Sequence, residues 1–62
     1  MTQKQALARA ATLLAEDAQC LKDSHTLQGK WSTDDPVDVS AKRDHDERLR
    51  LADRLRAMVR TA

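Results

Sequence analysis

The only glycine and the only proline of this 62-residue chain, Gly29 and Pro36, lie close together near its middle. Glycine is the usual residue just after a helix ends, and proline suits the first turn of the next helix. The segments on either side contain neither residue and are amphipathic along their length. The sequence therefore predicts one all-α domain over residues 1–62, with helices at about 3–28 and 36–60 joined by a loop at about 29–35.

The predicted helix ends carry residues that satisfy free backbone amides. Thr2 and Gln5 have the spacing of a capping box at the start of the first helix. Asp35 is placed to cap the second helix, with Asp38 in its first turn. Gly29 is predicted to end the first helix, because glycine adopts the left-handed conformation required there.

A heptad pattern indicates how the helices pack. In the first helix leucine recurs every seven residues, and alanine follows four residues after the first two leucines. This is the spacing of side chains that face a partner helix. The predicted core of the hairpin and its dimer consists of Leu7, Ala11, Leu14, Ala18, Leu21, Ala52, Leu55 and Val59.

The apolar faces are wider than one neighbouring helix can cover. Residues such as Leu13 and Cys20 extend the face of the first helix to about half of its circumference. A chain this short, rich in alanine and without phenylalanine or tyrosine, also has too little apolar surface to fold stably alone. We therefore predict that two antiparallel hairpins form a homodimeric four-helix bundle. The sequence leaves open whether the two hairpins run parallel or antiparallel to each other.

One charged residue interrupts each apolar face, Asp17 in the first helix and Arg48 in the second. Residues at the same height of an antiparallel hairpin have a constant sum of residue numbers. If Leu27 lies opposite Asp38, Asp17 lies opposite Arg48. Because a buried charge is tolerated only when it is paired, we predict a buried ion pair that fixes the register of two repetitive faces.

Few residues could carry chemistry. His25, His45 and the single Cys20 do not have the spacing of a zinc site. We predict that the histidines bond to neighbouring polar groups and that Cys20 is a buried apolar residue. The sequence also has no catalytic triad, no glycine-rich phosphate loop and no paired-carboxylate cleft. It therefore predicts a protein without enzymatic activity, metal, cofactor or small-molecule substrate.

One tryptophan and a group of arginines stand out as candidate binding residues. Trp31 lies in the predicted loop, where it either caps the bundle over Leu27 and Val37 or anchors a partner. The C-terminal segment 48–62 is rich in arginine, whereas acidic residues gather around the loop. These arginines either stabilise the end of their helix or bind an anionic surface of a protein or RNA. The candidate partner-binding residues are Trp31, Arg50, Arg54, Arg56 and Arg60.

Charge and hydropathy indicate where the protein works. The net charge of +1 gives no overall attraction to nucleic acid or to a membrane surface. No apolar run approaches the length of a membrane span. The first residues lack the basic-then-apolar order of a secretory signal. We therefore expect a cytoplasmic protein. The heavy use of alanine and of arginine over lysine, which is common in GC-rich bacterial genomes, indicates a bacterial cell.

The leucine and alanine pattern on two long helices resembles that of the Rop family of plasmid copy-number proteins. These are antiparallel dimers of hairpins that bind paired RNA loops with a helical face. Residues 21–26, 29–31 and 44–56 are also similar to small helical proteins of phages and prophages. Some small dimeric helical phage proteins bind and block a bacterial protein. The resemblances imply a regulator that inhibits a bacterial host protein, with RNA binding as the alternative.

Overall fold

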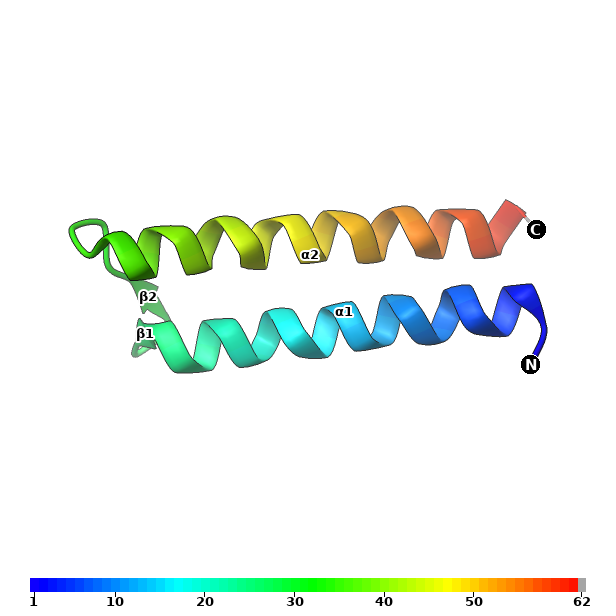
Figure 1. Ribbon diagram of the computed structural model, residues 1–62, viewed down its shortest axis with the longest axis horizontal. Coiled ribbons are helices and arrows are strands. Elements are labelled where there is room, and N and C mark those ends of the chain that lie inside the picture. Colours follow the sequence, from blue (N-terminus) through cyan, green and yellow to red (C-terminus); the bar gives the residue numbers. More distant parts are fainter. Residues whose placement is uncertain (62) are drawn as a thin grey trace.

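The computed structural model describes residues 1–61, which form two long antiparallel helices (Figure 1). Helix α1 spans Gln3–His25 and helix α2 spans Pro36–Thr61. Between them lie two short strands, β1 at Thr26–Leu27 and β2 at Lys30–Trp31, which pair antiparallel. The first residues of the chain and the end of α2 lie together at the end of the hairpin opposite the strands. The predicted helical hairpin is therefore confirmed, with a small β-hairpin added in its loop.

The predicted caps at the start of both helices are present. The Thr2 hydroxyl accepts a hydrogen bond from the amide of Gln5 at 3.1 Å, and the Gln5 side chain accepts one from the amide of Thr2 at 2.9 Å. The Asp35 carboxylate accepts a hydrogen bond from the amide of Val37 at 2.9 Å. Each bond satisfies an amide that has no partner within the helix, which fixes where the two helices begin.

The connection between the helices differs from the prediction. α1 ends at His25 and not near residue 28, because Thr26 is extended and its hydroxyl donates to the carbonyl oxygen of Lys22. Gln28 and Gly29 form the two-residue turn between the strands, and both have a positive φ, 54° and 80°. A tight turn of this kind requires positive φ at both central residues. Gly29 therefore closes a β-hairpin, and the prediction that it ends α1 was wrong.

Replacing Gly29 should test this turn directly. A β-carbon at Gly29 would meet nothing within 4 Å, so an effect of Gly29→Ala arises from the backbone and not from a clash. We expect Gly29→Ala to lower the free energy of unfolding by about 1–2 kcal/mol, because φ is in the left-handed region. Gly29→Asn should lose less, since asparagine tolerates this conformation. Urea unfolding followed by circular dichroism measures both variants, and equal losses would contradict the assignment.

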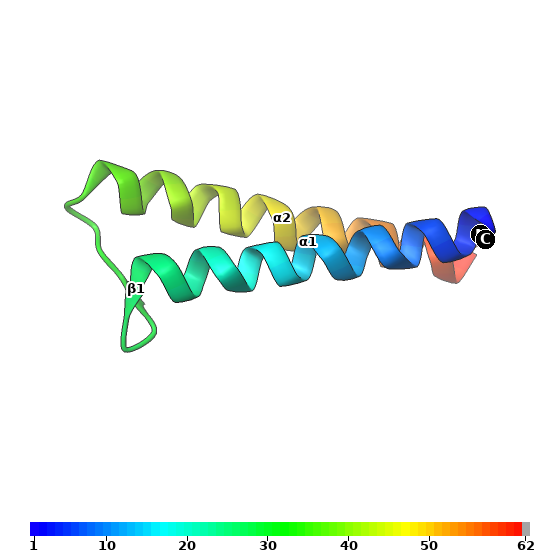
Figure 2. The same cartoon turned by 60° about the horizontal axis from the view of Figure 1, so that its bottom comes forward.

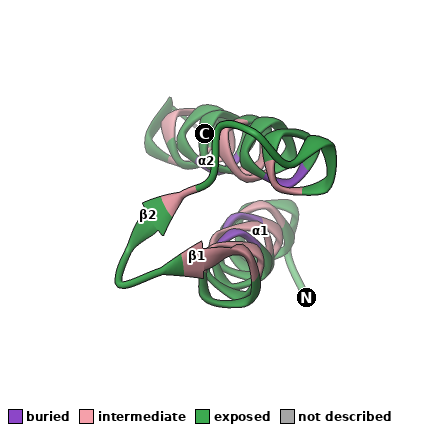
Figure 3. Cartoon of the chain, turned by 90° about the vertical axis from the view of Figure 1, so that its left-hand side faces the viewer, coloured by how far each residue is buried: buried purple, intermediate pink, exposed green. Residues whose placement is uncertain are grey.

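Only small side chains are enclosed between the helices. Ala11, Ala18 and Ala52 are completely buried and Ala41 is 6% exposed, and no large side chain among residues 1–61 is fully buried. In Figure 3 the buried positions lie where the helices face each other. The other predicted core residues, listed here, are only half-buried: Leu7, Leu14, Leu21, Leu55 and Val59. A single hairpin therefore leaves most of its predicted core incomplete.

The two helices are not strictly parallel. They lie side by side along their length in Figure 1, and they overlap in Figure 2 towards the end opposite the loop. Trp31 and His45 place aromatic rings together at the loop end, whereas the alanines Ala11 and Ala52 lie towards the open end. Within residues 1–61, neither helix has the length and apolar character needed to cross a membrane.

Candidate functional site

Large apolar side chains are exposed along one side of each helix. On α1, Leu13 is 48% exposed, and Cys20, seven residues later, is also exposed. The prediction that Cys20 is buried was therefore wrong. On α2 the exposed residues include Val37, Leu51 and Met58, which are spaced by multiples of seven. We call this surface the outer apolar face, formed by Ala6, Ala10, Leu13 and Cys20 of α1 and by Val37, Leu51 and Met58 of α2.

An ion pair shows that the two halves of this face are on the same side of the hairpin. Arg48 Nε donates a hydrogen bond to Asp17 Oδ2, and Arg48 Nη1 donates a second to the Asp44 carbonyl oxygen at 3.1 Å. Asp17 shares a side of α1 with Leu13, four residues before it, and Arg48 shares a side of α2 with Leu51, three residues after it. The pair therefore crosses between the helices in the middle of the outer apolar face.

The ion pair joins the residues that the sequence predicted, but it is not buried. The Arg48 and Asp17 side chains are 30% and 57% exposed. They are less buried than predicted because the face that contains them is not covered in a single hairpin. An exposed pair of this kind contributes about 0–1 kcal/mol to stability. Within one hairpin its main effect is on register, since it holds the middle of α1 against the middle of α2.

Two contacts tie the loop end together. His25 Nδ1 lies 3.0 Å from Asp38 Oδ1, which joins the last turn of α1 to the first turn of α2. Asp38 lies in the first turn of α2, where a carboxylate matches the helix dipole. The ring of Trp31 lies against that of His45, with centroids 5.3 Å apart. Trp31 therefore contacts His45, whereas Leu27 and Val37, which one of the two alternatives for Trp31 had it cover, are 81% and 63% exposed.

His45 also contacts its neighbour in α2. Its Nδ1 atom lies 2.9 Å from Asp46 Oδ1, and Lys42 Nζ lies 3.1 Å from Asp46 Oδ2. The hydrogen bond with His45, followed by that from Lys42, holds the pKa of Asp46 below the usual value for aspartate. These contacts confirm that both histidines bond to nearby carboxylates.

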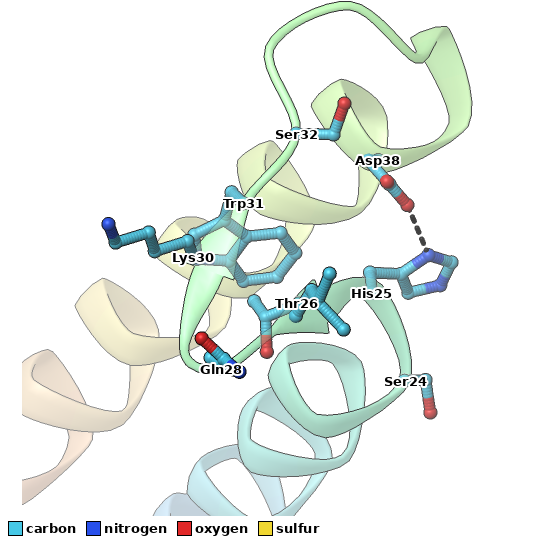
Figure 4. Close-up of a pocket in the computed structure, with 9 residues that line it drawn as sticks. Ser24, His25, Thr26, Gln28, Lys30, Trp31, Ser32 and Asp38 are labelled. Carbon is cyan, nitrogen blue, oxygen red and sulfur yellow. Dashed lines mark hydrogen bonds and ion pairs between the residues drawn. The ribbon is translucent and has the colours of Figure 1, made fainter.

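Trp31 borders two open concavities. Figure 4 shows the first, which has a volume of about 530 Å³ and lies between the strands and the His25–Asp38 pair. The second, of about 630 Å³, has Trp31 and Val39 as its apolar residues, with Lys30 and Lys42 beside them. Within residues 1–61, no hydrogen bond joins His25 to a serine, so the first concavity lacks the contact between a nucleophile and a base that covalent catalysis uses.

The candidate arginines are exposed but do not form one patch. Arg56 and Arg60 border a concavity beside Ala8 and Thr12 of α1, whereas Arg50 borders another with Val39. Arg56 also lies 3.7 Å from Asp53, its only ion pair within the described residues. The four arginines are the following: Arg50, Arg54, Arg56 and Arg60. The structure thus distributes them over at least two sides of α2.

A metal-binding arrangement is not found in the described part of the chain. No group of three or more histidine, cysteine, aspartate or glutamate side chains in residues 1–61 is placed to hold an ion. In comparisons with known proteins, no family model, curated protein or solved structure matches this chain significantly.

Two features of these surfaces were not predicted from the sequence. The Lys30–Trp31 strand, which positions the indole, carries no periodic signal because it is two residues long. The apolar wall beside Trp31 includes Val39, which is 41% exposed. Val39 lies one turn into α2, on the side that faces away from the alanines of α1. Helical periodicity would have predicted this position.

Proposed function

We propose that this chain is a non-enzymatic helical-hairpin protein that forms a homodimer and acts by binding another macromolecule. The observation that carries the proposal is the distribution of apolar side chains. Among residues 1–61, alanine is the only residue type fully enclosed between the helices, whereas Leu13, Leu51 and Met58 remain between 44% and 48% exposed. A hairpin with this distribution requires another helical surface to complete its core.

The surface that a dimer leaves free is the proposed binding site for the other macromolecule. Dimerisation through the outer apolar face leaves Trp31 and the exposed arginines available to a different partner. Tryptophan and arginine are enriched among the residues that contribute most to protein–protein binding. We propose a protein partner, and in the most concrete form, which follows the resemblance to small phage proteins, the chain is a regulator that inhibits a bacterial protein in the cytoplasm.

RNA binding is the second candidate function. Arg50, Arg54 and Arg60 make no ion pair with any residue in the described range, so their guanidinium groups are free to contact phosphates. The lack of aromatic side chains beside them argues against stacking on single-stranded RNA, which usually requires such residues. Their spread over α2 also argues against one continuous phosphate-binding surface.

Two measurements test the proposed function. Sedimentation equilibrium should give twice the mass of one chain, and a monomer at all concentrations would reject the homodimer. Tagged wild-type protein should then capture a bacterial protein that the Arg54→Glu/Arg56→Glu variant captures less. A gel shift with a panel of hairpin and loop–loop RNAs at low salt separates the second candidate, because RNA binding should weaken steeply as salt rises.

A further inference from the structure

The polar and apolar layers of the outer apolar face specify how a second copy would dock on it. The Asp17–Arg48 contact sets the register of the hairpin, so residues whose numbers sum to about 65 lie at the same height. By this rule Leu13 shares a layer with Leu51, and Ala6 shares one with Met58. The layers towards the open end are thus apolar on both helices, and the middle layer is charged on both.

We propose that two copies pack through their outer apolar faces with their loops at the same end, so that the two Asp17–Arg48 pairs form a ring of four alternating charges. This inference rests on the proposed homodimer and specifies its geometry. A twofold axis parallel to the helices keeps every residue at its own height and places α1 over α2 of the partner subunit. Asp17 then faces Arg48 of the partner subunit, and Arg48 faces Asp17 of the partner subunit.

The opposite arrangement fits these residues poorly. With the loops at opposite ends, the twofold axis is perpendicular to the helices and places α1 over α1 of the partner subunit. With this axis at the height of the charged layer, Asp17 would face Asp17 of the partner subunit, and Leu51 would lie near the height of Asp44 of the partner subunit. Like charges facing each other in an interface cost several kcal/mol according to measured complexes. The proposed arrangement instead places Leu13 on Leu51 of the partner subunit.

The charges at the two ends of the hairpin are compatible with a dimer whose loops lie at the same end. Placing the loops together brings acidic residues such as Asp34 and Asp35 to one end, but both are exposed and screened by salt. The basic residues Arg56 and Arg60 lie beside Ala8 and Thr12, away from the outer apolar face. The interior charges at Asp17 and Arg48 therefore decide the orientation, because water and salt screen them least.

A stable interface buries about 800 Å² on each partner, so a dimer of this kind would cover roughly one sixth of the 4747 Å² of accessible surface of the chain. The arrangement also covers Leu13, Leu51 and Met58, which are among the large apolar residues that one hairpin leaves exposed. It differs from the antiparallel dimers of the Rop family, because its orientation follows from the charged layer of this chain.

Disulfide trapping tests the orientation. Two double variants are made, Leu13→Cys/Cys20→Ser and Leu51→Cys/Cys20→Ser. Neither variant alone should form a disulfide between subunits, because in the proposed dimer the same position of the two copies lies on diagonally opposed helices. Mixed, refolded together and oxidised, they should form a disulfide-linked heterodimer between Cys at 13 and Cys at 51. Leu13→Cys with the native Cys20 retained should not crosslink to Cys20 of the partner subunit, since the two positions are about 10 Å apart along the bundle.

The outcomes separate the two proposals. Crosslinking of Leu13→Cys to native Cys20 between subunits, with no heterodimer in the mixture, would show that the loops lie at opposite ends and overturn the inference. A wild-type protein that is monomeric in sedimentation would reject the homodimer itself. Circular dichroism verifies that each variant is helical. If the leucine variants lose helicity, the exposed pair Ala6→Cys and Met58→Cys, in the Cys20→Ser background, provides the same test in another layer.

Discussion

Replacing Ala18 with leucine should lower the free energy of unfolding by about 1–3 kcal/mol. Ala18 is completely buried between the helices, so three added carbon atoms have no space unless α1 and α2 move apart. For a domain of this size, each kcal/mol corresponds to a change in melting temperature of about 4–8 °C. Thermal unfolding followed by circular dichroism, at one fixed chain concentration, measures the effect.

Ala8→Leu is the matched control for this prediction. Ala8 lies in the same helix but is exposed, and the substitution is chemically identical. Because a surface change away from the core alters stability by about 0.5 kcal/mol or less, Ala8→Leu should melt close to the wild type. If Ala18→Leu is as stable as Ala8→Leu, the close approach of α1 and α2 at Ala18 is not required for stability.

Reversing either charge of the central ion pair should abolish the dimer, and mixing the two variants should restore it. Arg48→Asp places four carboxylates in the interior of the dimer, and Asp17→Arg places four guanidinium groups there. An unpaired buried charge costs about 3–5 kcal/mol, which corresponds to a loss of about 100-fold or more in the dissociation constant. A 1:1 mixture again contains two charges of each sign, so a heterodimer should form.

Sedimentation of the two variants, separately and mixed, measures this effect. The control is Arg48→Met, which removes the charge without reversing it and should leave the hairpin helical while weakening the selection of one dimer. If the variants remain monomeric after mixing, the pair contributes only within one hairpin and does not contact its copy. If both variants dimerise as the wild type does, the pair lies outside the interface.

The sequence predicted the helices and their register because these depend on periodic patterns. The Thr2 and Asp35 caps are local hydrogen bonds, so residue type and spacing are sufficient to locate them. The contact between Asp17 and Arg48 followed from the constant sum of residue numbers in a hairpin. Nothing more than the position of the turn was needed for that prediction.

The loop was predicted less well for a physical reason. A glycine with positive φ occurs both after a helix and in a tight β-turn, so Gly29 alone does not distinguish them. The extended conformation of Thr26, which ends α1 earlier, depends on a bond back to Lys22 and has no periodic signal. The burial of Cys20 was also overestimated, because the sequence shows that a residue is on an apolar face but not whether that face is covered.

If the protein forms the proposed dimer, its concentration in the cell determines how long it persists there. One hairpin encloses Ala11, Ala18, Ala41 and Ala52 and little else, so its folding supplies only a small part of the apolar burial that offsets chain entropy. In the proposed dimer the rest is supplied on association, and unfolding therefore depends on concentration. Newly made chains at low copy number are then exposed to proteases, and the protein accumulates only once synthesis is fast enough for chains to meet before they are degraded.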